Sequence, residues 1–488
     1  MITASQLYNY VQCPHRVVLD MYGNPAERDE PNAFVELLWE QGVDHEARIV
    51  ADLGVTTTLR AMPAEERERE TRAAIARGDA LVYGGRLTVD DLVGEPDLLE
   101  RRGDKYVPGD IKSGSGLEGD DDDAKLKRHY AYQLGHYVHI LENLGFADGS
   151  REAFIIDRTG TRVPYVLTEP QGVRNPTSWW DAYQAALTDV RALVAKQKVS
   201  RAALSATCKL CHWYTHCKDD MVATDDLTLV AELGRAKRDV MIGEIANVHA
   251  LAACDPSTYI DKKKTRFPGI GPDSLIKFHE RAKLLTTDNP QPYLKAAISL
   301  PMSENEVFFD IEADPMRDVV YLHGFVERKH ADPRSAGFIQ FFAEGAEAMQ
   351  EEAAFRAAWA YLSLRSKDST IYYYSKYERT AYRKLAEKFP GVCSRADVDA
   401  LFELETMIDL YAVVKSSTEW PTYDQSIKTL AQFAGFKWRD THPSGAASIE
   451  WFHRYTERQD EATKIRILEY NEDDCLATGV VLDKVRSL

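Results

Sequence analysis

Apolar pairs on either side of a Gly-Asp dipeptide predict a β-hairpin within residues 95–112. Two leucines occupy positions 98–99, and a tyrosine and a valine occupy positions 106–107. Gly-Asp at positions 103–104 is a two-residue hairpin signal, because glycine adopts a positive φ without steric cost. Pro108 has no N–H to donate, so we expect the second strand to be an edge strand or a bulged one.

Folding this hairpin about its turn places Asp97 opposite Asp110. Directly opposed residues have Cβ atoms about 5 Å apart, and like charges at that separation repel. Facing carboxylates are therefore expected where a hard cation lies between them. Lys112 follows Asp110 by two residues and therefore shares its face of the strand. Two acids and a lysine can hold Mg²⁺ or Mn²⁺, activate a water and stabilise a pentavalent phosphate. For the D-x-K pattern alone, a surface hairpin with scattered charges is the simpler interpretation.

Two predicted helices in the same half of the chain carry further polar candidates. The segment 34–53 contains His45, and the segment 127–144 contains Gln133 and Tyr137. Residues four apart on a helix share a face, so Gln133 and Tyr137 can position a nucleotide or the attacking water together. On sequence alone, a packed histidine and ordinary polar residues at the edge of the core are the competing interpretations.

The second half of the chain carries two acids on an otherwise apolar strand. Residues 307–315 read VFFDIEADP, with Asp310 and Glu312 two apart and therefore on one face. Two carboxylates on such a strand are costly unless a cation pairs with them. Residues 319–326 suit the adjacent antiparallel strand, and residues 371–374 predict a further strand.

More acidic residues lie near the helices that follow these strands. Glu378 is close to the start of one helix, and Asp409 is close to the start of the next. The last helix contains Tyr470 and Asp474, which are four residues apart and share a face.

Residues 225–300 predict a helical insert with a glycine turn. Three lysines and an arginine within 262–266 precede PGIGP at 268–272, which opens a helix and resembles a helix-hairpin-helix. The backbone N–H groups of such a turn accept a DNA phosphate, and Lys277 adds positive charge nearby. A purely structural turn is the alternative. Residues 114–123 predict a flexible acidic loop.

Composition limits the classes of protein that fit this chain. Its 488 residues suggest two or three domains, and 44% hydrophobic with 28% charged residues is typical of a soluble globular protein. A net charge of −17 argues against a surface coated with basic residues for non-specific nucleic-acid binding. No apolar run reaches about 18 residues, and the N-terminus lacks the layout of a signal peptide, so we expect a cytoplasmic protein without a membrane partner.

Seven cysteines in a chain without an export signal predict metal binding or buried thiols before disulfides. Three of them form a C-x₂-C-x₅-C cluster, a specific spacing that calls for a fourth ligand. The cluster is Cys208, Cys211 and Cys217. The candidates for the fourth ligand are Cys13, His212 and His216.

The first half resembles the RecB-like PD-(D/E)xK nucleases of the iron–sulfur branch, which includes CRISPR-adaptation exonucleases and AddB-type nuclease domains. That family places one N-terminal cysteine before the nuclease core and three clustered cysteines after it. It also places between them, in order, the residue types found here at His45, Gly94, Asp97, Asp110, Lys112, Gln133 and Tyr137.

This resemblance implies a [4Fe–4S] cluster on Cys13, Cys208, Cys211 and Cys217 that joins the two ends of the domain. It implies metal binding by His45, Asp97 and Asp110, and catalytic roles for Asp97, Asp110, Lys112, Gln133 and Tyr137. Four thiolates suit zinc as well as an iron–sulfur cluster.

The second half resembles the RNase-H-like DEDD exonucleases of the DnaQ superfamily. Their pattern is D-x-E on the first strand, an acid on a middle helix and Y-x₃-D or H-x₃-D on the last helix. The resemblance implies that Tyr470 orients the attacking water. It implies metal ligands at Asp310, Glu312, Glu378 and Asp474. Glu378 departs from the usual aspartate, with Asp409 as an alternative, so a degenerate domain that only holds DNA is a competing interpretation.

Together these observations predict an α/β protein in three parts. Residues 1–222 are expected to form a PD-(D/E)xK restriction-endonuclease-like domain with the cluster, and 301–488 an RNase-H-like α/β domain. A small helix-hairpin-helix-like domain over 223–300 joins them. The predicted function is metal-dependent DNA cleavage, with Mg²⁺ or Mn²⁺, by an exonuclease on single-stranded DNA in DNA repair or CRISPR adaptation.

The sequence also fits other interpretations. In the first of them, a single site cuts and the other half guides DNA. Alternatively, the protein is a nucleic-acid-binding subunit of a helicase–nuclease or adaptation complex, with one active site or none. The chain has no G-x₄-G-K-[ST] phosphate loop, so any helicase motor would belong to a partner. A zinc protein with an inert nuclease fold is a third interpretation.

Overall fold

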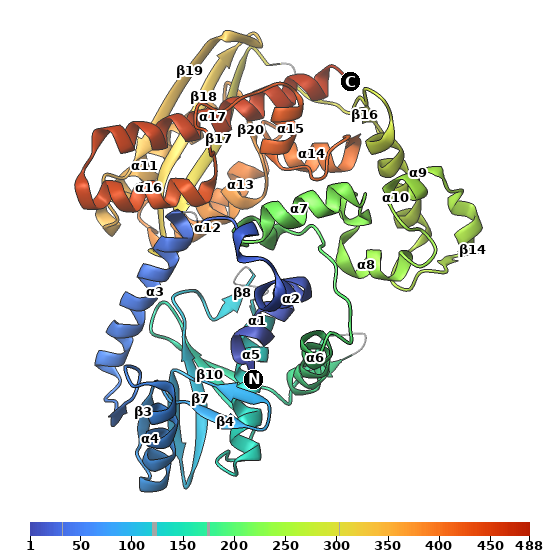
Figure 1. The fold of residues 1–488 in the computed structure, drawn as a ribbon. Helices are drawn as coiled ribbons and strands as arrows, with labels where there is room; N and C mark the ends of the chain where they lie inside the picture. Colours follow the sequence, from blue (N-terminus) through green and yellow to red (C-terminus); the bar gives the residue numbers. More distant parts are fainter. Residues whose placement is uncertain (32, 120–123, 173–175, 302) are drawn as a thin grey trace. The chain divides into compact units, whose positions relative to one another are not determined.

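The computed structural model describes residues 1–31, 33–119, 124–172, 176–301 and 303–488 (Figure 1). Part of the predicted acidic loop, residues 120–123, lies outside the described residues. The chain divides into two compact units. Unit 1 comprises Met1–Ala202 and Ala206–Cys217, and unit 2 comprises Ala203–Ser205 and Lys218–Leu488. None of the described helices combines the length and the apolar composition that crossing a bilayer requires.

Unit 1 is built on a six-stranded mixed sheet with the order β11-β10-β7-β6-β3-β2. Its strands are β2 (Thr57–Thr58), β3 (Leu81–Tyr83), β6 (Leu98–Arg102), β7 (Lys105–Ile111), β10 (Glu152–Ile156) and β11 (Arg162–Val166). The predicted hairpin is confirmed, because Arg102 pairs with Lys105 across the turn and Leu98 pairs with Gly109. This register places Asp97 opposite Asp110.

The prediction of an edge or bulged strand at Pro108 was wrong. β7 is an interior strand, with β6 on one side and β10 on the other. The ladder with β10 begins only at Gly109, which pairs with Phe154. Pro108 pairs with Leu99 of β6, so its missing N–H falls before the start of the second ladder. An interior strand therefore tolerates this proline.

Helix α5 (Arg128–Asn143) supports the strands that carry the acidic pair. Its residues Leu134, Val138 and Leu141 are buried in one core with α1 and α6. The other helices of the unit are α1 (Ala4–Gln12), α2 (Pro14–Tyr22), α3 (Ala33–Asp52), α4 (Ala64–Arg77) and α6 (Trp179–Val194). Helix α7 (Tyr214–Ala223) begins in unit 1 and ends in unit 2. Short strands are β1 (Ile2–Thr3), β4 (Leu87–Val89), β5 (Leu92–Gly94), β8 (Leu117–Glu118), β9 (Lys125–Leu126), β12 (Pro170–Gln171) and β13 (Thr177–Ser178).

Unit 2 contains a five-stranded sheet with the order β19-β18-β17-β20-β21. The strands are β17 (Asn305–Asp314), β18 (Val319–Lys329), β19 (Asp332–Phe342), β20 (Thr370–Tyr373) and β21 (Met407–Asp409). As predicted, β17 and β18 are antiparallel. β20 runs parallel to β17, and a register shift lies between Glu312 and Ala313.

Successive side chains of β17 point to opposite faces of the sheet and enter two different cores, as the two-residue period of a strand requires. Phe308 packs in the core formed by α14, α15, α16 and α17, whereas Phe309 packs in the core formed by α11, α12 and α13. On the first face lie α14 (Leu410–Ser417), α15 (Ile427–Phe433), α16 (Gly445–Arg458) and α17 (Glu461–Arg486). On the second face lie α11 (Ala348–Arg365), α12 (Tyr377–Lys388) and α13 (Arg395–Phe402).

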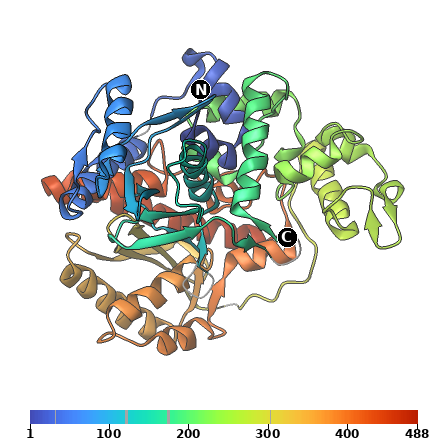
Figure 2. The same cartoon turned by 90° about the horizontal axis from the view of Figure 1, so that it is seen from below.

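A helical segment precedes this sheet and forms a small cluster of its own (Figure 2). It contains α8 (Gly234–Met241), α9 (Val248–Ala253), the hairpin of β14 (Ile260–Asp261) and β15 (Lys264–Thr265), and α10 (Pro272–Thr286). The predicted glycine turn is present, with Gly269 at φ +80° before α10. Two short strands, β16 (Tyr293–Leu294) and β22 (Thr418–Glu419), pair this segment with the sheet-containing part of the unit.

A buried ion pair strengthens the same junction. Arg281 of α10 donates from Nε to Glu419 of β22 at 2.8 Å, and from Nη1 to Glu232 at 3.1 Å. Lys295 also donates to Glu419, at 3.0 Å. The side chains of Arg281 and Glu419 are only 4% and 6% exposed, so neither charge has an alternative partner in bulk water.

We predict that Arg281→Met lowers the free energy of unfolding by about 3 kcal/mol, because it leaves Glu419 buried with less compensation. Urea denaturation would measure the change. The double variant Arg281→Met/Glu419→Leu should recover part of the loss, since it removes both charges. Equal stability of Arg281→Met and the wild type would contradict the role assigned to this pair.

Candidate active sites

Asp97 and Asp110 meet in the interior of unit 1. The backbone N–H of Asp97 donates to Oδ1 of Asp110 at 3.3 Å, and the N–H of Ile111 donates to Oδ2 of Asp97 at 2.9 Å. Lys112 Nζ lies 2.6 Å from Oδ2 of Asp110. Asp97 is 8% exposed and Asp110 is 1% exposed. The two acids and the lysine therefore form one buried group, as the hairpin register predicts.

The charges in this group strongly affect one another. Burial raises the pKa of Asp97 well above its usual range, and the neighbouring Asp110 raises it further, while Lys112 opposes both effects. Burial alone would lower the pKa of Lys112, but the attraction of Asp110 and Asp97 outweighs it and raises that pKa. The lysine is therefore held as a cation beside the two carboxylates.

Helix α5 adds the predicted glutamine and tyrosine to the same group. Gln133 Nε2 donates to the hydroxyl of Tyr137 at 3.1 Å, which confirms that they share a face. Burial raises the pKa of Tyr137, and Asp110 and Asp97 contribute to that rise, which places the phenol near both carboxylates. Among the described residues, Gln133 Oε1 has no hydrogen-bond partner although it is buried.

Glu46, the residue after His45, acts with its charge on Asp97, and His45 itself is buried with an Nε2 that has no hydrogen-bond partner among the described residues. His45 Nδ1 lies 2.9 Å from Arg48 Nη2, and its pKa is lowered by burial and by Arg48. Glu46 accepts a hydrogen bond from the hydroxyl of Tyr83 at 2.8 Å, and its charge raises the pKa of Asp97.

Arg60 links the same two acids. It lies 3.6 Å from Glu46 and 3.5 Å from Asp97. Sequence reasoning missed both Glu46 and Arg60. The only available signal was the acid that follows His45 on the predicted helix.

The cysteine segment lies against the N-terminal helices of unit 1. Cys13 lies between α1 and α2. Burial raises the pKa of the Cys211 thiol, and the charges of Cys13 and Cys208, when these thiols are ionised, raise it further. The two candidate histidines have acidic partners instead. His212 Nε2 lies 2.8 Å from Asp20 Oδ1, and His216 Nδ1 lies 3.2 Å from Glu27. Of the three candidates, Cys13 is the one whose charge acts on a thiol of the three-cysteine cluster.

Asp310, Glu312 and Asp474 form an acidic triad in unit 2. One oxygen from each lies within 4.8 Å of the other two. Trp438 Nε1 donates to Asp474 Oδ1 at 2.7 Å, and Asn471 Nδ2 donates to Asp310 Oδ2 at 2.7 Å. The strand β17 and the helix α17 thus bring together the acids that the sequence pattern singled out.

Burial and, after it, repulsion shift the titration of Glu312 and Asp310. Burial raises the pKa of Glu312 to about 8, with a further contribution from Asp474. Burial also raises the pKa of Asp310 well above its usual range, followed by the charges of Asp474, Glu312 and Glu378. Glu312 therefore holds a proton near neutral pH unless a cation replaces it.

Glu378, one of the two candidate acids, acts with its charge on Asp310 of the triad. Glu378 is 3% exposed, and burial raises its pKa to about 8. Among the described residues, its Oε2 is buried and has no hydrogen-bond partner. Asp409 instead caps α14, where its Oδ1 accepts a hydrogen bond from the N–H of Ala412 at 3.0 Å. Ser375, just before α12, has a φ of +140°, an uncommon value for a residue with a side chain.

Lys428 of α15 completes the triad's surroundings. Its Nζ donates to the hydroxyl of Tyr470 at 2.7 Å and lies 3.2 Å from both oxygens of Asp474. No pattern in the sequence marked this lysine, because it reaches the site from a separate helix.

Both acidic groups fit a hard divalent ion. Their ligands are carboxylate oxygens, which Mg²⁺ and Mn²⁺ prefer. Each group also contains a buried oxygen that lacks a hydrogen-bond partner among the described residues, on Gln133 in one and on Glu378 in the other. Such oxygens are costly to bury unless a ligand satisfies them.

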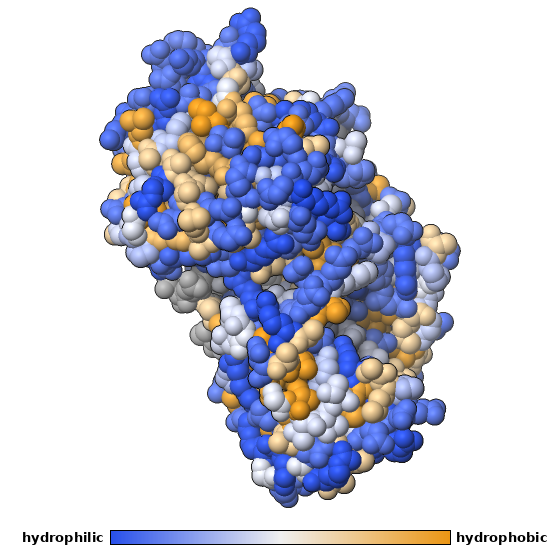
Figure 3. Space-filling view, turned by 90° about the vertical axis from the view of Figure 1, so that its left-hand side faces the viewer, coloured by the Kyte–Doolittle hydropathy of each residue, from blue (hydrophilic) through white to orange (hydrophobic). Residues whose placement is uncertain are grey.

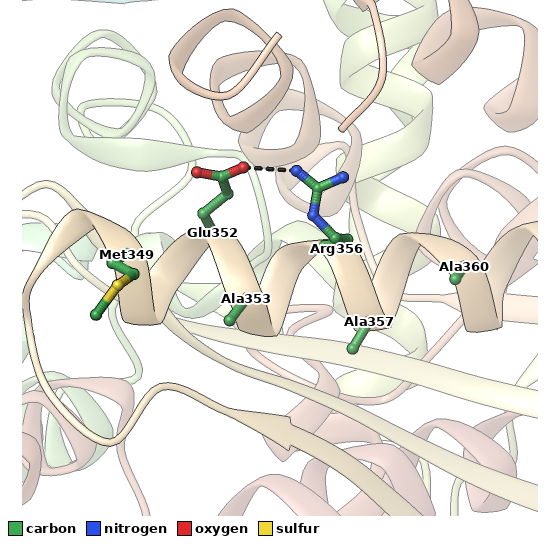
Figure 4. A pocket seen from close by; sticks show the side chains of 6 residues that line it. All are labelled: Met349, Glu352, Ala353, Arg356, Ala357 and Ala360. Atoms are coloured by element: carbon green, nitrogen blue, oxygen red, sulfur yellow. Dashed lines mark hydrogen bonds and ion pairs between the residues drawn. The ribbon is translucent and has the colours of Figure 1, made fainter. Parts of the chain in front are cut away.

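A depression on α11 lies apart from these groups (Figure 4). It is lined by Met349, Glu352, Ala353, Arg356, Ala357 and Ala360, with Glu352 and Arg356 paired at 2.6 Å. Helix α11 covers the sheet face opposite to α17, so this depression contributes nothing to the triad.

In a view that faces the left-hand side of Figure 1, the surface is mainly hydrophilic with scattered apolar patches (Figure 3).

Comparisons with known proteins place a nuclease domain on each acidic group. Residues 3–218 match the family model of the PD-(D/E)XK nuclease superfamily, and residues 307–486 match that of the RNase_H superfamily. No curated protein matched the chain. The matches confirm the predicted mixed α/β fold with both domain types. Both domains indicate a nuclease, and proteins of both kinds usually use divalent metal ions.

We predict that Mn²⁺ binding at the triad strengthens by more than about ten-fold from pH 6 to pH 8, because protonated carboxyls must lose their protons to bind a metal. The raised pKa of Glu312 also makes the stability of the metal-free protein depend on pH. The protonated carboxyl contributes stability that is fully present below about pH 4.5, the usual pKa of glutamate, and is lost as the pH rises through about 8. Manganese titrations and thermal unfolding with a chelator would measure both effects.

The matched variant is Glu312→Gln, which should flatten the pH dependence of stability. A wild-type manganese affinity that stays constant from pH 6 to pH 8 would contradict the prediction.

Proposed function

We propose that the protein is a metal-dependent deoxyribonuclease that hydrolyses phosphodiester bonds, acting as an exonuclease on single-stranded DNA. The observation that carries this proposal is the pair of buried carboxylate groups, each within a region that matches a nuclease superfamily. When bound, Mg²⁺ or Mn²⁺ supplies Lewis-acid polarisation of the phosphate and a lower pKa for water.

In unit 1, Asp97 and Asp110 would hold the ion, with a further ligand from α3. His45 is the residue implied by the family resemblance, and Glu46 is the acid whose charge acts on Asp97. Lys112 keeps its positive charge beside Asp110 and stabilises the negative charge that develops on the phosphate. Gln133 and Tyr137 position the nucleotide or the attacking water through their shared face.

In unit 2, Asp310, Glu312, Asp474 and Glu378 would hold metal, and Tyr470 would orient the attacking water. The triad distances and the unsatisfied oxygen of Glu378 support this assignment. The basic hairpin at Lys264–Thr265 and the turn at Gly269 would bind DNA phosphate next to the RNase-H-like part of the same unit.

We further propose a [4Fe–4S] cluster on Cys13, Cys208, Cys211 and Cys217. The neighbourhood of Cys13, Cys208 and Cys211 supports it. A tetrahedral zinc on the same four thiolates is the alternative, and metal analysis separates the two.

A second candidate function is that of a binding subunit of a helicase–nuclease or CRISPR-adaptation complex. Lys428 favours it for unit 2, because a lysine already occupies the side of Asp474 that a metal would need. In that case the RNase-H-like half would guide DNA, and only the other half would cut.

We predict that Asp110→Ala lowers Mn²⁺-dependent cleavage of end-labelled single-stranded DNA by the site of unit 1 about 100-fold. Asp310→Ala should lower cleavage by the site of unit 2 to a similar extent, because each substitution removes a metal ligand. Time courses on DNA labelled at either end would separate two activities of opposite polarity. The matched controls are Asp104→Ala and Asp368→Ala, which remove exposed carboxylates from the same two units.

Loss of all cleavage in Asp110→Ala together with full activity of Asp310→Ala would leave unit 1 as the nuclease and unit 2 as a binding module. No cleavage by the wild-type protein on any labelled end would overturn the proposal and favour the partner-dependent subunit.

We predict that anaerobically purified protein contains about four iron atoms per chain and absorbs broadly in the visible range, as iron–sulfur proteins do. Cys211→Ser should lose the iron, whereas Cys254→Ser, outside the cysteine group, should retain it. Stoichiometric zinc without iron in the anaerobic protein would contradict the cluster and identify a zinc site.

A further inference from the structure

Lys428 is the one cation that contacts the acidic triad directly among the described residues. Its Nζ is equidistant, at 3.2 Å, from the two oxygens of Asp474, and it donates to Tyr470 at 2.7 Å. Its charge acts on Asp310 and Glu312 as well. The side chain is 27% exposed, so the ammonium lies at the mouth of a buried acidic group.

The fold holds this lysine in place from several sides. Lys428 lies in the first turn of α15, whose start is fixed by Ser426, which accepts a hydrogen bond from the N–H of Thr429 at 3.4 Å. The ammonium also lies 4.6 Å from the ring centre of Tyr470 and 5.5 Å from that of Trp438. Aromatic faces at these distances favour a cation.

The contacts of Asp474 leave little room for a second cation. Lys428 lies against both of its oxygens, and Trp438 donates to Oδ1 at 2.7 Å. Yet Asp474 is also the residue that joins Asp310 and Glu312 in the triad. A divalent ion among the three acids must therefore share Asp474 with the ammonium or displace it.

We propose that Lys428 is a built-in counter-ion that competes with a divalent ion for Asp474 and thereby sets the metal affinity of the triad. This inference deepens the proposed function, because it concerns the same site, but it rests only on metal binding and not on cleavage. Without metal, the lysine compensates the three carboxylates and holds Tyr470 and Asp474 in position. With metal, its positive charge repels the ion.

The test compares Lys428→Met and Lys428→Gln, which remove the charge, with Lys428→Arg, which keeps it. All are made with Asp97→Asn and Asp110→Asn, so that unit 1 does not contribute. Mn²⁺ binding is measured by titration with detection of free Mn²⁺. Loss of a unit charge at contact distance should tighten binding by about ten-fold or more in the Met and Gln variants. The Arg variant should stay within about three-fold of the parent.

A second measurement uses the same proteins without metal. Thermal unfolding with a chelator should show a lower midpoint for the Met and Gln variants, and added Mn²⁺ should raise their midpoint more than that of the parent. Lys437→Met, which removes an exposed lysine from the segment that precedes Trp438, is the control and should change neither measurement.

Unchanged or weaker Mn²⁺ binding in both Lys428→Met and Lys428→Gln would overturn the inference, as would absence of binding in every variant. Binding only after the charge is removed would support it in its strongest form. Cleavage assays separate the two claims. A wild-type protein that never cuts, combined with tighter binding in the Met and Gln variants, would refute the proposed function and leave this inference intact.

Discussion

Repulsion between buried carboxylates is the constraint around which both units are organised. Taking an ionised carboxylate out of water is costly, and placing a second one beside it adds to the cost. Asp110 and Asp310 are nevertheless held on the interior strands β7 and β17, with Asp97 directly before β6 and Asp474 on α17. Ladders on both sides fix these strands, so the backbone cannot relax to separate the charges. The remaining relief is a proton, a lysine or a metal ion.

The two units supply their lysines in different ways. Lys112 follows Asp110 on the same stretch of chain, so its ammonium is tied to the acid that it compensates. Lys428 reaches Asp474 from a separate short helix, and its position depends on how α15 packs against α17. The first arrangement suits a lysine that remains in the site during a reaction. The second suits a lysine whose contact with the acid can be exchanged for another ligand.

How much of this could be read from the sequence depends on the distance along the chain over which each contact forms. The Gly-Asp turn fixed the register that pairs Asp97 with Asp110, and the i, i+4 spacing brought Gln133 and Tyr137 together. The contact of Asp474 with the distant Asp310 and Glu312 followed from the family resemblance, whereas Glu46 and Lys428 were missed because no pattern or resemblance marked them. The error at Pro108 has a local cause, since the rule about its missing N–H does not say where the neighbouring ladder begins.

The junction between α10 and β22 has a consequence for dividing the protein into fragments. A fragment that starts at residue 301 would include Glu419 but would lack Arg281, Lys295 and the strand that pairs with β22. It would expose an edge strand carrying an uncompensated acid, a feature that promotes misfolding and aggregation. A recombinant fragment of the RNase-H-like part should therefore begin near Lys218, so that it retains the helical segment that belongs to the same compact unit.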